Sequence, residues 1–134
     1  MSTNDNVKTI QAVYEAFGRG DIATILDVLT DDVDWASEAD STEVPWWGVR
    51  HGKAEVADFF TQLGTEMEVE EFTPLAIIGD GDVVLTVARY RAKSRTNGKA
   101  ATMNLHHHWT FRDGKIAYYR GAEDTLATLR TFQP

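Results

Sequence analysis

Three consecutive histidines, His106, His107 and His108, are the residues of this sequence best suited to chemistry. The whole chain of 134 residues contains only four histidines. Near neutral pH an imidazole acts as an acid, a base or a metal ligand. Successive side chains of a strand point to opposite faces, so only His106 and His108 share a face. We therefore expect no metal site, because the pair would need a further ligand from elsewhere or from a symmetry mate.

Two glycine turns predict which histidine faces the interior. Asn97-Gly98 and Asp113-Gly114 separate alternating segments, as in two-residue hairpins. Counting from these turns places Ala88 and Arg120 opposite His107. The concave face is then predicted to carry Val84, Thr86, Ala88, Tyr90, Leu105, His107, Trp109, Phe111, Ile116, Tyr118 and Arg120. A β-bulge would reverse this assignment beyond the bulge.

Charged side chains near the predicted cavity suggest acid–base partners for His107. A cation at Arg120 would lower the pKa of His107 and anchor a carboxylate, enolate or phenolate. Glu38 and Asp40 follow the inward Trp35, where the strand leaves the cavity mouth. A carboxylate desolvated there would be a general base with a raised pKa. The alternatives are a structural histidine and an exposed acidic loop.

Aromatic residues predict a wall for a flat or hydrophobic ligand. Four tryptophans contribute to it, and three tyrosines are candidate hydrogen-bond donors to ligand oxygens. These ligand-binding candidates are Trp35, Trp46, Trp47, Trp109, Tyr14, Tyr90 and Tyr118. The alternative for each of them is core packing or contact with a partner subunit.

The elements that position these residues divide the chain into two halves. Apolar spacing predicts helices over residues 7–17, 22–29 and 53–65, the second of them capped by Asp21, with a strand at "VDWAS". The second half predicts an antiparallel meander, with Pro74 in an edge strand, and then a short helix capped by Asp124. This pattern indicates one α+β domain over residues 1–134, with helices packed on one face of a curved sheet.

The segments "AFGRGDIATILDVLTDDVDW", "PWWGVRHGKAEVADFF" and "HHHWTFRDGKIAYYRGAEDT" resemble signatures of the NTF2-like superfamily, in its SnoaL-like branch. The resemblance implies a cone-shaped α+β barrel with three helices over a curved mixed, mainly antiparallel sheet, an interior cavity and usually a homodimer. Members include steroid isomerases, polyketide cyclases, dehydratases, epoxide-opening enzymes and non-catalytic binders. Fold alone does not decide among these functions.

The catalytic residues of the ketosteroid isomerases are not retained. Their tyrosine falls on Val13, beside Tyr14, their base falls on Ser37, beside Glu38, and their oxyanion aspartate falls on His107. Steroid isomerase chemistry by that mechanism is therefore not expected, although His107 occupies a cavity position of the family.

Composition narrows the function classes. A net charge of −8 argues against general binding of nucleic acid or anionic lipid, and the absence of cysteine excludes disulfides and thiol chemistry. No apolar run suits a membrane span or a signal peptide, so we expect a cytoplasmic protein.

We expect an enzyme that needs no cofactor, acting on a small hydrophobic oxygenated molecule by isomerisation, cyclisation, dehydration or epoxide opening. The alternative is a non-catalytic binding module. A homodimer through the outer face of the sheet is expected in both cases.

Overall fold

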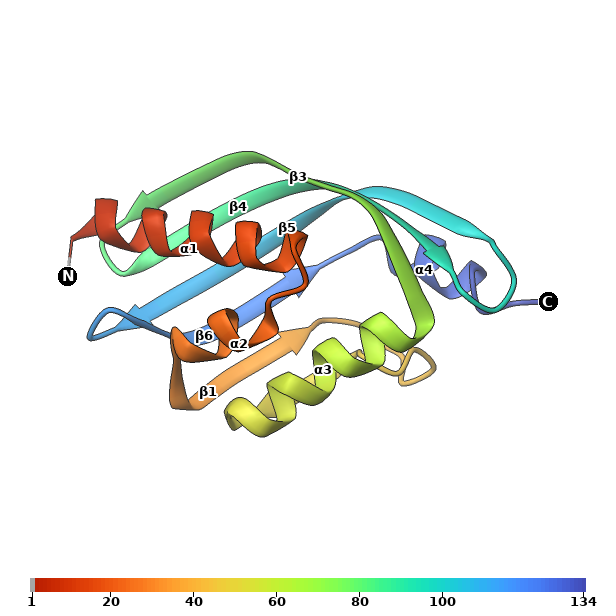
Figure 1. Cartoon of the computed structure of the whole chain (residues 1–134), viewed down its shortest axis with the longest axis horizontal. Coiled ribbons are helices and arrows are strands. Elements are labelled where there is room, and N and C mark those ends of the chain that lie inside the picture. Colours follow the sequence, from red (N-terminus) through yellow and green to blue (C-terminus); the bar gives the residue numbers. More distant parts are fainter. Residues whose placement is uncertain (1) are drawn as a thin grey trace.

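The computed structural model describes residues 2–134, and in this part of the chain four helices pack on a six-stranded sheet (Figure 1). The helices are α1 (Thr3–Gly18), α2 (Ile22–Asp27), α3 (Gly52–Glu66) and α4 (Thr125–Arg130). The strands are β1 (Leu29–Ser37), β2 (Gly48–His51), β3 (Met67–Asp80), β4 (Val83–Ser94), β5 (Ala100–Arg112) and β6 (Lys115–Ala122). The predicted α+β class is confirmed, and β2 is the one strand that the sequence did not indicate.

Side-chain caps set the starts of three helices. Ser2 and Asp5 form a capping box at α1, so this helix begins earlier than the spacing of apolar residues suggested. Asp21 caps α2 through the backbone N–H of Thr24, and Asp124 caps α4, both as expected.

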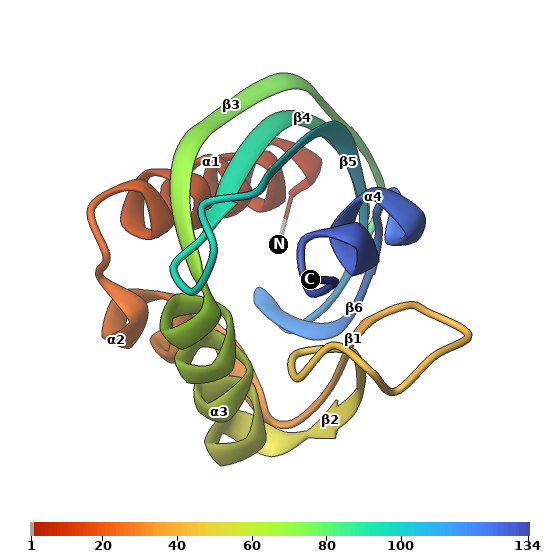
Figure 2. The ribbon, with the colours of Figure 1, turned by 90° about the vertical axis from the view of Figure 1, so that its right-hand side faces the viewer.

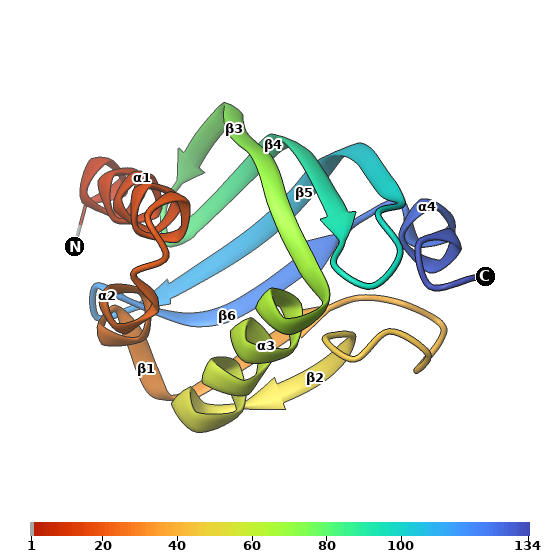
Figure 3. The ribbon, with the colours of Figure 1, turned by 45° about the vertical axis from the view of Figure 1, so that its right-hand side comes forward.

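The sheet has the strand order β2-β1-β6-β5-β4-β3 and bends around helices α1 to α3 (Figure 2). Strands β1 and β6 are parallel and the other neighbours are antiparallel. The sheet is curved but not closed, because β2 and β3 remain as edges (Figure 3). The predicted mixed, mainly antiparallel sheet is confirmed, and Pro74 lies in the edge strand β3. Within residues 2–134 no helix has the length and apolar character needed to cross a membrane.

The hairpin between β4 and β5 has a longer loop than the sequence suggested. Ser94 donates its backbone N–H to Lys99, 2.8 Å away, so four residues form the loop instead of two. Thr86 consequently pairs with His107, where Ala88 was expected. A shift of two residues preserves the side-chain faces, since the period of a strand is two. His107 therefore lies on the concave side, as predicted.

A β-bulge interrupts the pairing of β5 with β6. Thr110 pairs with Tyr118 whereas Phe111 pairs with Ile116, which leaves Ala117 as the extra residue. Beyond this point each side chain of β6 occupies the face opposite to the expected one. The prediction that Tyr118 and Arg120 face inward is wrong.

Candidate functional site

A cavity of about 80 Å³ lies between the concave side of the sheet and the helices. Its wall is mostly aromatic and aliphatic, with side chains from α1, α2, α3 and every strand except β2. The polar side chains that line it are those of Tyr14, Ser37, Tyr90, His107, Tyr119 and Glu123. A few polar groups in an apolar hollow are typical of a small-molecule site.

His107 of β5 belongs to a buried hydrogen-bonded chain. Its Nδ1 lies 2.6 Å from the hydroxyl of Tyr14 on α1, which also contacts the hydroxyl of Thr86 on β4. The indole N–H of Trp109 donates to Thr86 over 3.3 Å. Burial lowers the pKa of His107 to about 3, so the imidazole is neutral at neutral pH.

Tyr119 of β6 takes the inward position that Tyr118 was expected to hold. The bulge turns its ring toward the cavity, where it lies between Trp35 and Trp109, with ring centroids 4.1 and 4.4 Å away. Gly121, the strand partner of His107, leaves the space for the Tyr119 hydroxyl. No local signal in the sequence marks the bulge, so the sequence did not identify Tyr119.

Gly121→Ala is expected to destabilise the fold by about 1–3 kcal/mol. The added Cβ would lie 2.9 Å from the Tyr119 ring carbon Cζ and closer still to its hydroxyl, so the buried ring must shift. Urea unfolding of the variant measures this cost. Gly64→Ala is the control, since its Cβ meets no atom within 4 Å and alanine suits the interior of α3. A Gly121→Ala variant as stable as the wild type would contradict the close packing.

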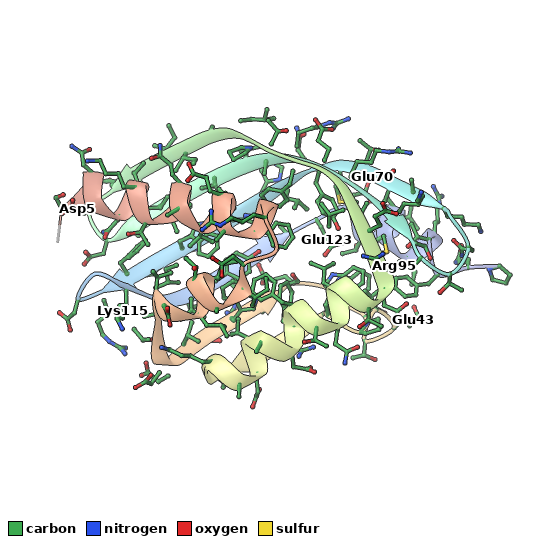
Figure 4. The ribbon with its side chains drawn as sticks, viewed as in Figure 1. Asp5, Glu43, Glu70, Arg95, Lys115 and Glu123 are labelled. Carbon is green, nitrogen blue, oxygen red and sulfur yellow. The ribbon has the colours of Figure 1, made fainter. Side chains whose placement is uncertain are left out.

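Glu123 is the carboxylate of the cavity, and the sequence did not single it out. It follows β6 directly, and Figure 4 shows it within the outline of the fold, whereas Glu43 and Lys115 lie at the periphery. The carboxylate accepts the indole N–H of Trp47 over 3.0 Å and the hydroxyl of Thr128. Burial raises its pKa, although these hydrogen bonds oppose the shift. A carboxylate of raised pKa in a cavity is a candidate acid or base.

Several polar atoms of the cavity have no hydrogen-bond partner among residues 2–134. Within residues 2–134 the hydroxyls of Tyr90 and Tyr119 and the Nε2 of His107 form no hydrogen bond, and none of these atoms is sealed from solvent. Burial raises the pKa of both tyrosines, so their hydroxyls stay protonated. The indole N–H of Trp35 is fully buried and also lacks a partner in the described residues. Unpaired polar groups around a hollow are a reason to expect a polar ligand there.

Glu38, Asp40 and Arg120 do not join His107. They line a separate shallow hollow whose lining does not include that histidine. The Arg120 guanidinium binds Asp34 at 3.1 Å and stacks 4.4 Å over the ring of Tyr118 on the outer face. The low pKa of His107 arises mainly from burial and secondly from His106, instead of from Arg120 as expected.

The aromatic candidates divide between the cavity and other places. Five of them line it: Tyr14, Trp35, Trp46, Tyr90 and Trp109. Trp47 is buried outside the lining and donates to Glu123 instead. Tyr118 lies on the outer face against His108, with ring centroids 5.4 Å apart.

His106 and His108 are exposed on the outer face, opposite to His107. Among residues 2–134 no group of three histidine, aspartate or glutamate side chains is arranged to hold a metal ion. The three adjacent histidines are thus separated by the strand into one cavity residue and two surface residues.

Comparisons with known proteins agree with this architecture. Residues 10–119 match the sequence model of a family described as the SnoaL-like domain. Patulin synthesis protein F of Aspergillus clavatus is 32% identical over 96 residues, which are 66% of this chain and 46% of that protein. The match therefore spans less than half the length of this curated relative.

Solved structures of similar proteins cover the whole fold. An NTF2-like protein from Burkholderia pseudomallei is 28% identical, with a TM-score of 0.90 and 100% of both chains covered. TerC, which was co-crystallized with polyporic acid, is 27% identical, with a TM-score of 0.86, covering 97% of this chain and 99% of that chain. The NTF2-like fold expected from the sequence is confirmed.

Proposed function

The chain belongs to the SnoaL-like family, and we propose that it is an acid–base enzyme without a cofactor, acting on a small hydrophobic oxygenated molecule. The observation that carries this proposal is the pair of His107 and Glu123 in one cavity. One is an imidazole that burial keeps neutral, and the other is a carboxylate whose pKa burial raises. Titratable groups whose pKa values are shifted by burial in one hollow are typical of functional sites.

The surroundings of the pair support proton transfer on an organic substrate. Apolar and aromatic walls exclude bulk water, which strengthens electrostatic interactions with the reacting atoms. A carboxylate of raised pKa removes a proton near neutral pH more effectively than an ordinary one. Isomerisation, cyclisation, dehydration and epoxide opening all need such transfers. The co-crystallization of TerC with polyporic acid supports a small organic ligand in the same fold.

Deuterium exchange tests the proposal. We would incubate the protein in D₂O with cyclic ketones, enones and aryl epoxides and follow isotope incorporation and product formation by NMR. The wild type is expected to act on at least one of these classes, and both His107→Gln and Glu123→Gln to slow that reaction by about 100-fold or more. Glu38→Gln is the matched control and is expected to react as the wild type does.

The alternative is a non-catalytic binding module that uses the same cavity. Tryptophan fluorescence distinguishes it, because Trp35, Trp46 and Trp109 line the cavity and a ligand there would change their emission. Binding of a ligand without any turnover would contradict the enzyme proposal and support the non-catalytic binding module. A protein that neither binds nor converts any compound of the three classes would contradict both functions.

The outer face of the sheet supports a homodimer as part of the proposal. Ile78 and Leu85 are strand partners there and are 65% and 53% exposed. Apolar side chains that meet on a sheet surface are typical of an interface.

Leu85→Lys is therefore expected to convert a dimer into a monomer, measured by light scattering coupled to size exclusion. Leu126→Lys, at a residue 54% exposed on α4, is the control and is expected to leave the dimer intact. A wild type that is monomeric at high concentration would refute the dimer.

A further inference from the structure

The hydrogen-bonded chain behind His107 has a direction. The indole N–H of Trp109 is a donor only, so it donates to the oxygen of Thr86. The Thr86 hydroxyl then has one hydrogen left to donate. Among residues 2–134 its one other partner is the hydroxyl of Tyr14, and Thr86 is 3% exposed. Thr86 therefore donates to Tyr14.

The direction continues to the imidazole. The oxygen of Tyr14 accepts from Thr86, and among residues 2–134 the one acceptor left for the hydrogen of Tyr14 is Nδ1 of His107, 2.6 Å away. Nδ1 is thus an acceptor. A neutral imidazole carries one N–H, so this proton resides on Nε2.

The reverse direction leaves a buried group unpaired. If Nδ1 of His107 donated to Tyr14, Tyr14 would donate to Thr86, whose oxygen would then receive two hydrogens. The hydrogen of Thr86 itself would have no acceptor in the described part of the chain. Buried hydroxyls without a partner are disfavoured. Each hydrogen bond is therefore donated in the direction from Trp109 toward His107.

We propose that Thr86 and Tyr14 are positioning residues that hold His107 as the Nε2–H tautomer, so that it presents a hydrogen-bond donor to the cavity. Nε2 has no partner among residues 2–134 and is open to the cavity. The neighbouring ring carbon Cδ2 points toward Gly121, beside the Tyr119 hydroxyl.

The Nε2–H tautomer gives His107 and Glu123 different roles in proton transfer, and these roles rest on the proposed function. An imidazole whose Nδ1 is occupied and whose Nε2 carries hydrogen donates to an oxygen of the ligand. For a carbonyl compound, the C–H bond beside the carbonyl breaks, its proton binds to the carboxylate of Glu123 in the same cavity, and its electron pair forms an enolate whose oxygen accepts the Nε2–H of His107. The ligand class is a molecule with an accepting oxygen, such as a carbonyl or an epoxide.

The tautomer is measured directly by ¹⁵N NMR on the ligand-free protein at pH 7. Long-range ¹H–¹⁵N correlations distinguish a pyrrole-type nitrogen, which carries hydrogen, from a pyridine-type nitrogen. His107→Gln assigns the signals by their disappearance. We expect Nε2 to be pyrrole-type and Nδ1 pyridine-type. The opposite pattern in the wild type would overturn the proposal.

Variants test which residues impose the tautomer. Tyr14→Phe removes the donor to Nδ1, so the Nε2–H population is expected to fall. Thr86→Val is expected to reduce it in the same direction, and Thr86→Ser to restore the wild-type spectrum. Unchanged His107 signals in Tyr14→Phe would overturn the proposal that Tyr14 holds the tautomer. If Tyr14→Phe does not fold, the comparison of Thr86→Val with Thr86→Ser replaces it. Identical His107 spectra for these two variants would overturn the proposal.

Because these spectra need no ligand, their outcome is independent of turnover. A protein that shows the Nε2–H tautomer yet converts no substrate would contradict the proposed function alone. An active enzyme whose His107 carries hydrogen on Nδ1 would contradict only the proposal that Thr86 and Tyr14 hold the Nε2–H tautomer.

Discussion

Replacing His107 by glutamine is expected to make the fold much less sensitive to acid between pH 6.5 and about 3. Burial lowers the pKa of this histidine from 6.5 to about 3 in the folded state. Between these values the unfolded chain binds a proton that the folded chain does not bind. The contribution is therefore fully present above pH 6.5 and is lost as the pH falls. The loss amounts to about 1.4 kcal/mol of unfolding free energy for each pH unit.

Urea unfolding at a series of pH values measures this slope. The wild type also loses stability in acid through its carboxylates, so the informative quantity is the difference between wild type and His107→Gln. His108→Gln is the matched control, because the neighbouring histidine is exposed on the outer face. Parallel pH curves for wild type and His107→Gln would show that His107 is not buried in its neutral form.

Trp109→Ala is expected to cost about 3–5 kcal/mol of unfolding free energy. The side chain is 2% exposed and packs on Tyr119 and Trp35, with ring centroids 4.4 and 5.8 Å away. Truncation would join its volume to the cavity and leave the Thr86 oxygen without its indole donor.

Chemical denaturation compares this variant with two others. Trp109→Phe keeps most of the packing and is expected to cost less than the alanine variant. Leu126→Ala, at a residue 54% exposed, is expected to change stability by only about 0.5 kcal/mol or less. A cost below about 1 kcal/mol for Trp109→Ala would mean that the core around the cavity relaxes, against the close packing seen here.

The face of His107 could be predicted although the turn beside it was misjudged. The loop after β4 has four residues, from Arg95 to Gly98, instead of two, which moved the pairing by two positions. An even shift exchanges the neighbours of a strand residue but keeps its face. The predicted inward position of His107 was therefore correct despite the misjudged turn, whereas its pairing with Thr86 was not predicted.

The identity of the cavity carboxylate could not be predicted, because it depends on contacts between distant parts of the chain. Glu38 and Asp40 follow a strand that points toward the cavity, yet the chain turns outward there and places them near Arg120. Glu123 lines the cavity directly after β6, and its carboxylate accepts a hydrogen bond from Trp47, 76 residues earlier in the sequence. Contacts over such separations have no local sequence pattern.

The sequence by itself determined the helices and every strand except β2, the caps at Asp21 and Asp124, and the inward face of β5, because these depend on spacing within short segments. The tertiary structure alone decided which groups accompany His107. One bulged residue, Ala117, turned Tyr119 inward and Arg120 outward, and the packing of β6 beside β1 brought Glu123 to the cavity. A single extra residue reverses every side chain beyond it, and only the completed sheet selects where that residue goes.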